Sequence, residues 1–275
     1  DSPLISFSTE IDDLYGNFSG GDLLFSNGAI IPNQSLTVLF GMRYDIGLDG
    51  IQWIGDRGAL IKLATALVNI KREEWIKDPQ LFVKYLKEYK LDLWFSIEQD
   101  FEQKEKMILD GDVLSAVNGT VVVSQDSLFP AAVPAGIPDR GVDFGLDGLM
   151  VWRSDNPEIA LKSLRFSSEI LYEDDAANAF TDGDILRING GVETLHESLI
   201  HNFYPPADFL GLDALSGPVR NRVETPDPMI TKIGGIGIGD INEGAVLTGG
   251  GTGAFPSGTA QSGLSDGTPA LPYRP

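Results

Sequence analysis

The sequence predicts a mainly β fold, in which three repeated units of four short strands carry an inserted helical hairpin and an extended C-terminal tail. Three observations predict it: a set of motifs that recurs three times, strand-like alternation with Asn-Gly turns inside each copy, and a change to Gly- and Pro-rich sequence after Ser216. The β domain spans residues 1–216, with repeats at about 4–54, 91–153 and 161–216, a helical insertion at 57–90 and a tail at 217–275.

Each copy contains three short motifs in the same order: Phe-Ser-x-Glu, then Gly-Asp-aliphatic-Leu, then Gly-Leu-Asp-small-aliphatic. The motifs begin at Phe7, Gly21 and Gly47 in the first copy, at Phe95, Gly111 and Gly145 in the second, and at Phe166, Gly183 and Gly211 in the third. A repeated unit usually buries the apolar face of its neighbour. The repeats therefore favour a scaffold or a multivalent surface.

The strands of each copy follow from local pattern. Partial alternation predicts a first strand in residues 4–8, 91–96 and 161–166. Asn-Gly pairs at residues 27, 118 and 189 predict hairpins, because both residues tolerate positive φ. The spacing of Leu36 with Phe40, and of Leu199 with Phe203, predicts a short helix, and the Gly-Leu-Asp motif leads into a last apolar strand. Trefoil-like, propeller-like and sandwich-like arrangements all fit this pattern.

Residues 57–90 interrupt the spacing of the repeats. Leu60, Leu63 and Leu67 recur at helical spacing, and Asp78-Pro79 is a natural start for a second helix, so we expect a helical hairpin against the β body. Its basic residues predict either a solvated helix face or a local docking face. These residues are Lys71, Arg72, Lys84, Lys87 and Lys90.

The tail at 217–275 is dense in Gly, Pro, Ser and Thr, a composition that does not form a core of its own. We expect it either to pack along its own domain or to be held by a neighbouring subunit. The second alternative makes the protein a component of an assembly through its tail.

Composition excludes several classes of function. A formal charge of −20 disfavours nucleic acid and anionic membranes as partners. The chain has no cysteine, which excludes disulfides and thiolate metal sites. Its longest apolar stretch, 59–70, is too short to span a membrane. The acidic, cysteine-free sequence that starts at Asp1 favours an exported protein, extracellular or on the cell surface, with a trimmed chain as the alternative reason for that start.

Acidic residues recur at matching places in the copies, and two interpretations compete. Loops rich in carboxylates suit Ca²⁺, while an Asp after Gly is also a common turn residue that accepts hydrogen bonds from the backbone. No EF-hand spacing is present. The candidate metal ligands are Glu10, Asp22, Asp49, Glu98, Asp112, Asp147, Glu169, Asp184 and Asp213.

Familiar catalytic motifs find little support. His196 and His201 are five residues apart, whereas a zincin needs a spacing of four. No Gly-x-Ser-x-Gly elbow is present, and the glycine runs of the tail lack the P-loop pattern. A glycosidase with paired carboxylates stays open, although no two acids stand out. Trp53, Trp94 and Trp152 predict either core packing or a sugar-stacking platform.

The motif set resembles uncharacterised β-repeat modules of exported bacterial proteins, from Leu4 to Leu215 without the insertion. The resemblance implies export and β structure and no catalytic residue. We therefore expect a non-enzymatic structural or binding module, a subunit of a surface or filamentous assembly whose tail contacts a neighbour. The alternative is a calcium-stabilised carbohydrate-binding protein or glycoside hydrolase, with a glycan as its partner.

Overall fold

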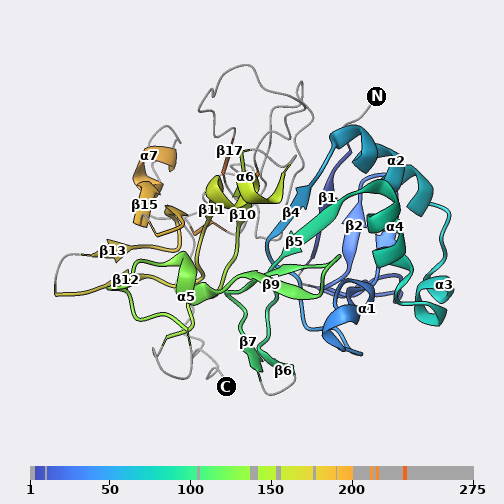
Figure 1. Ribbon diagram of the computed structural model, residues 1–275, viewed down its shortest axis with the longest axis horizontal. Helices are drawn as coiled ribbons and strands as arrows, with labels where there is room; N and C mark the ends of the chain where they lie inside the picture. Colours follow the sequence, from blue (N-terminus) through green and yellow to red (C-terminus); the bar gives the residue numbers. More distant parts are fainter. Residues whose placement is uncertain are drawn as a thin grey trace, which may run out of the picture.

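The computed structural model is β-rich, with several small antiparallel sheets and a few helices (Figure 1). The prediction of a mainly β fold is therefore confirmed at this level. The structure describes residues 4–9, 11–103, 106–136, 142–152, 156–175, 178–189, 191–200, 211–212, 215–216 and 232–233. Of the predicted tail, only 232–233 falls within the described residues.

The first sheet contains three strands in the order β1 (Ser6–Phe7), β2 (Leu23–Phe25) and β3 (Ile30–Ile31). The expected Asn-Gly hairpin joins β2 to β3, and Gly28 has a φ of 89° that favours glycine. A short helix, α1 (Asn33–Leu36), and the 3-10 helix η1 (Val38–Phe40) follow. They bury Leu36 and Phe40, the pair that predicts a helix here.

The second and third sheets contain four strands each, all antiparallel. The second has the order β4 (Ile51–Ile54), β5 (Asp92–Phe95), β8 (Val113–Ser115) and β9 (Thr120–Val123). The third has the order β10 (Leu149–Val151), β11 (Leu164–Phe166), β14 (Ile185–Arg187) and β15 (Gly191–Thr194). A short helix follows each sheet: α5 (Gln125–Leu128) and α7 (His196–Ile200).

The sheets interlock across the copies of the sequence repeat. Strand β4 ends the first copy but pairs with β5 of the second, with Ile51 opposite Phe95. Strand β10 pairs in the same way with β11 of the third copy, with Leu149 opposite Phe166. The last of these strands, β16 (Leu215–Ser216), pairs with β17 (Lys232–Ile233). Each of these sheets thus takes its first strand from the preceding copy.

The first strands of neighbouring sheets lie side by side near the centre of the molecule, where β10 contacts both β4 and β16 (Figure 1). The side chain of Gln52 on β4 joins two of them directly, because its Oε1 accepts a hydrogen bond from the Val151 backbone N–H at 3.0 Å. Small hairpins project from the connections between the second and third strands of these sheets. They are β6 (Phe101–Gln103) with β7 (Lys106–Ile108), and β12 (Tyr172–Glu173) with β13 (Ala179–Phe180).

One strand begins later than its sequence predicts. Residues 161 and 162 belong to helix α6 (Pro157–Lys162), and β11 begins only at Leu164. The side chain of Asn156 accepts hydrogen bonds from the Glu158 and Ile159 backbone N–H groups, and Pro157 occupies the first turn. This N-cap starts a helix that overrides the strand-like alternation.

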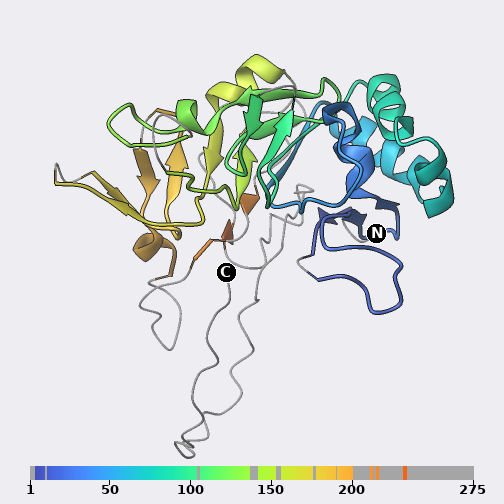
Figure 2. The same cartoon turned by 90° about the horizontal axis from the view of Figure 1, so that it is seen from below.

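The insertion forms three helices, where the sequence predicts a hairpin of two: α2 (Arg57–Leu67), α3 (Arg72–Lys77) and α4 (Leu81–Tyr89). They lie at one end of the molecule, beside the first sheet (Figures 1 and 2). Trp75 of α3 is 1% exposed and packs edge-on against Phe82 of α4, which in turn contacts Trp53. None of the described helices has the length and apolar character needed to cross a membrane.

The tryptophans that the sequence could assign to a sugar platform lie mainly in the core. Trp53 and Trp94 are 1% and 2% exposed, and Trp152 is partly buried against a small core cluster that includes Met150 and Leu215. A second core between the second and third sheets is centred on Phe129, whose ring lies 5.0 to 5.4 Å from those of Phe144, Phe166 and Phe180. The same core includes Val113 of β8 and Leu164 of β11, so it joins the two sheets.

Candidate functional site

The aspartate of the Gly-Asp-aliphatic-Leu motif plays the same part in all three copies. One carboxylate oxygen accepts a hydrogen bond from the backbone N–H three residues earlier, and the other accepts one from the N–H of the first residue of the following short helix. For Asp22 the donors are Ser19 at 3.0 Å and Asn33 at 2.9 Å, for Asp112 they are Leu109 at 3.2 Å and Gln125 at 2.8 Å, and for Asp184 they are Thr181 and His196, both at 2.8 Å.

These three carboxylates are 1% to 3% exposed, so the hydrogen bonds also compensate them for lost water. Burial raises the pKa of Asp112, and the bonds from Gln125 and Leu109 oppose that rise. The arrangement matches the turn alternative of the sequence analysis, because the carboxylates hold a turn and a helix start together.

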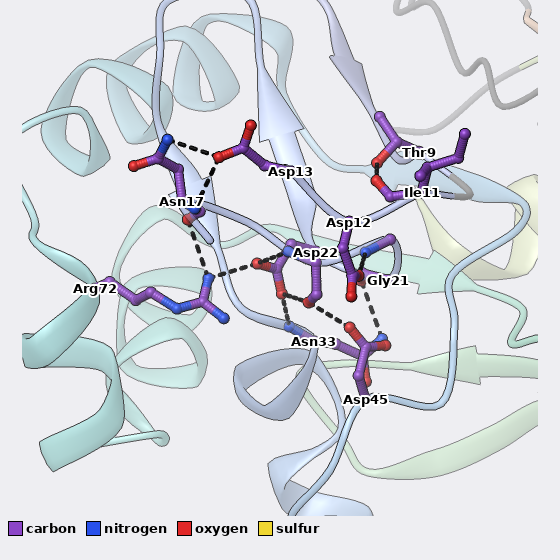
Figure 3. A network of polar contacts seen from close by, with 12 residues as sticks. Thr9, Ile11, Asp12, Asp13, Asn17, Gly21, Asp22, Asn33, Asp45 and Arg72 are labelled. Atoms are coloured by element: carbon purple, nitrogen blue, oxygen red, sulfur yellow. Dashed lines mark hydrogen bonds and ion pairs between the residues drawn. The ribbon is translucent and has the colours of Figure 1, made fainter. Parts of the chain in front are cut away.

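In the first copy, Arg72 joins this arrangement (Figure 3). Its Nη1 atom lies 2.6 Å from Asp22 Oδ2 and also donates to the Asn17 carbonyl oxygen at 3.3 Å. The Ser19 hydroxyl donates to Asp22 and lies against Asp45. One basic residue of the insertion therefore pairs with the β body instead of facing a partner.

A cluster of three other acids lies in the second copy. Asp100 follows β5, Asp110 precedes β8, and Asp143 lies two residues before Gly145; one carboxylate oxygen from each lies within 4.8 Å of the others. The Asp110 backbone N–H donates to Asp100 Oδ1 at 2.8 Å, and that of Gly145 donates to Asp143 Oδ1 at 3.4 Å. Asp110 Oδ1 and Asp143 Oδ2 are buried and receive no hydrogen bond from the described residues.

The electrostatics of this cluster favour a proton or a cation. Desolvation and the adjacent Asp143 carboxylate, with smaller contributions from Glu169 and Asp100, raise the pKa of Asp110 to about 9. Loss of solvent and the charge of Asp143 also raise the pKa of Glu169. Near neutral pH, Asp110 therefore holds a proton that it can share with Asp143, unless a cation compensates the like charges.

The sequence-predicted ligands mostly lie elsewhere. Glu98 and Glu169 pack over glycines of the Gly-Leu-Asp motif, so that a Cβ on Gly145 would lie 2.2 Å from the Glu169 carboxyl carbon. Asp49 and Asp147 are half-buried just before β4 and β10. Glu10 and Asp213 lie outside the described residues. Among the predicted ligands, Glu169 is the one whose charge acts on Asp110.

Asp143 was not among the predicted ligands, although the sequence contains a pattern that could have identified it. The first copy also has an acid two residues before its Gly-Leu-Asp glycine, at Asp45, and the Gly47 N–H donates to Asp45 Oδ1 at 2.9 Å. Asp12 likewise matches Asp100, since it accepts from the Gly20 N–H at 2.9 Å. Glycine takes the place of Asp110 in that copy, whereas the third copy has an acid there, Asp182, but Leu171 in the place of Asp100. The combination of all three acids is therefore specific to the second copy.

The serine of the Phe-Ser motif makes the junction between sheets. Ser96 is fully buried; its hydroxyl accepts from the Gly50 N–H and donates to the Leu146 carbonyl oxygen, both at 2.8 Å, and its own N–H donates to the Gly50 carbonyl oxygen. Ser167 repeats the pattern, because its N–H donates to the Gly148 carbonyl and its hydroxyl to that of Leu212.

No known protein family matches the chain, and neither curated proteins nor solved structures include a match to it.

Replacing Asp112 with Ala should lower the free energy of unfolding by about 2–4 kcal/mol, because two buried N–H groups lose a charged acceptor. Urea denaturation followed by circular dichroism measures the change. Asp175, which is exposed, provides the matched control: its change to Ala should shift stability by less than about 0.5 kcal/mol. Equal effects at both positions would contradict a structural role for Asp112.

Proposed function

We propose that this chain is a non-enzymatic structural or binding module, exported and used as a subunit of a cell-surface or filamentous assembly. The observation that carries the proposal is that the acids and serines recurring between copies make internal hydrogen bonds. Asp22, Asp112 and Asp184 hold turns to helices, while Ser96 and Ser167 join sheets. Such residues build a scaffold and leave the loops free to vary.

A propeller-like arrangement of repeated four-stranded units suits this scaffold best. The second and third sheets are antiparallel meanders whose first strands, β4 and β10, lie side by side. Blades of a propeller have this strand order around a shared centre, whereas a trefoil or a sandwich does not bring first strands together in this way. The arrangement supports association where an end strand such as β1 has a neighbour on one side only among the described residues, because such an edge can be extended by another chain.

Light scattering on the full chain at rising concentration tests the assembly. We expect the mean mass to rise above that of the 29.7 kDa monomer and to depend on concentration, because subunits associate by mass action. Measurement at physiological ionic strength limits repulsion between chains that each carry a charge of −20. A monomer at every concentration would overturn the proposal.

A second candidate is a calcium-stabilised carbohydrate-binding protein. The specific observation is the Asp100, Asp110 and Asp143 cluster, whose buried oxygens lack donors among the described residues. Hard oxygen ligands of this kind suit Ca²⁺, and a bound cation would offset the repulsion that raises the pKa of Asp110. A shallow hollow of about 560 Å³ lies beside Asp100, lined by polar residues and by the aromatic rings of Tyr44 and Phe101.

Calcium should raise the melting temperature, and more so at pH 8 than at pH 5, because the cation must displace the proton of Asp110. Without calcium, the folded-state pKa of about 9 lies above the unfolded value near 3.8, so the folded state holds the extra proton between these values and stability should fall as pH rises through this window. Differential scanning calorimetry with calcium or a chelator measures both effects.

The Asp110→Asn variant is the matched test of this assignment, since it keeps the shape and removes the charge. In this variant, calcium should no longer raise the melting temperature, and stability should depend less on pH between pH 4 and 9. The change Asp12→Asn, in the corresponding place to Asp100 in the first copy, should leave both unaltered. A calcium response that survives in Asp110→Asn would place the cation elsewhere.

Glycan screening tests the carbohydrate part of this candidate. Tyr44 is 58% exposed and borders the hollow, a position that suits stacking against a sugar ring. We expect any glycan binding to fall at least about tenfold in Tyr44→Ala. Tyr15, which is 89% exposed but does not line the hollow, provides the control. Binding that is unchanged in Tyr44→Ala would rule out this hollow.

A further inference from the structure

The two ends of the described repeat are incomplete in complementary ways. In the second and third sheets, β5 and β11 pair on one side with the first strand, β4 or β10. Within the described part of the chain, β1 occupies the place of β5 and β11 but pairs only with β2. At the other end, β16 is a first strand whose partner is the short strand β17 instead of a three-stranded remainder.

Ser8 shows what the β1 edge lacks. It corresponds to Ser96 and Ser167, whose N–H groups donate to a glycine carbonyl of the preceding Gly-Leu-Asp strand. Ser8 is only 5% exposed, yet its backbone N–H has no hydrogen-bond partner among the described residues. A buried polar group of this kind costs free energy unless something pairs with it. The missing partner is a strand backbone.

The register of the other sheets identifies the strand that fits. The residue four positions after the Gly of Gly-Leu-Asp pairs with the Phe of Phe-Ser: Ile51 with Phe95, and Leu149 with Phe166. By the same rule, Leu215 matches Phe7. In the structure, Leu215 pairs instead with Ile233 of β17. Strand β17 thus occupies the place on β16 that a Phe-Ser strand takes in the other sheets.

We propose that β16 of one copy of this chain pairs with β1 of a second copy, with Leu215 opposite Phe7, and that β17 gives up its place when this happens. The resulting sheet, in the order β16-β1-β2-β3, has the four strands and the antiparallel order of the second and third sheets. The inference rests on the proposed function as an assembly subunit and names the contact. It is β-strand addition, in which backbone hydrogen bonds join the chains and give Ser8 its partner.

The contact is head-to-tail, because it joins two different surfaces of the same chain. Each added copy presents its β1 edge at one end and, once β17 gives up its place, its β16 edge at the other, so the association continues unless the rotation between copies closes a ring. The net charge agrees with a short-range contact, since chains of charge −20 repel one another at a distance and need close backbone pairing to associate.

Two variants block the two edges separately. Ser8→Lys places a charge on the β1 edge, and Ser216→Pro removes a backbone N–H from β16. Each variant alone should be monomeric or associate at least about tenfold more weakly than the full unaltered chain. An equimolar mixture should form a dimer that does not grow further, because one intact edge remains on each partner. The exposed Ser127, changed to Lys, controls for the added charge.

The dimer in the mixture also shows that both variants fold, and circular dichroism of each alone confirms it. If Ser8→Lys does not fold, Ser8→Ala, which removes only the hydroxyl, should still weaken association several-fold. An unaltered chain that stays monomeric overturns the assembly proposal and this contact with it. An unaltered chain that assembles while both folded variants assemble equally well, or a mixture that gives no dimer, overturns the contact alone.

Discussion

The buried aspartate of the Gly-Asp motif is the interaction on which the rest of each unit depends. It bonds to the turn before a strand and to the first N–H of the helix that follows the next strand, so one side chain fixes both ends of a hairpin. The unpaired N–H groups at a helix start need acceptors, and these short helices have few other means of obtaining them. The negative charge also suits the helix start. Because the aspartate fixes the hairpin, its surrounding loops can differ in length without altering the strands.

The interlocking of copies extends this local constraint across the molecule. A sheet that takes its first strand from the preceding copy cannot form from one copy alone, so folding of one unit depends on the next. The buried serines strengthen that dependence, since Ser96 bonds to both the first strand of its own sheet and the residue leading to the next. An architecture of this kind gives cooperativity along the chain.

Much of the local structure could be predicted from the sequence, because it rests on short-range chemistry. The Asn-Gly turns form hairpins, with Gly119 and Asn189 at positive φ, and Leu36 and Phe40 are buried in the consecutive short helices α1 and η1. The exchange of strands between copies could not be predicted, since period and turn signals say which residues are extended and not which strand pairs with which. Helix α6 was not predicted, because the sequence after Asn156 alternates like a strand, whereas the N-cap that Asn156 provides starts a helix there.

The acidic cluster also could not be predicted from the motifs that recur in the three copies. The recurring motifs predicted metal ligands at aspartates such as Asp112, whose carboxylate instead accepts hydrogen bonds from the backbone of a turn and a helix start. The cluster instead depends on Asp143, outside the counted motifs, and on Asp110, where the first copy has a glycine. A third carboxylate in this place costs stability through like-charge repulsion, and nothing in the turn requires it, since Gly20 makes the same backbone bond. Asp110 therefore adds an acid to the cluster without adding to the turn, and the cation proposed for this site would offset the repulsion that it brings.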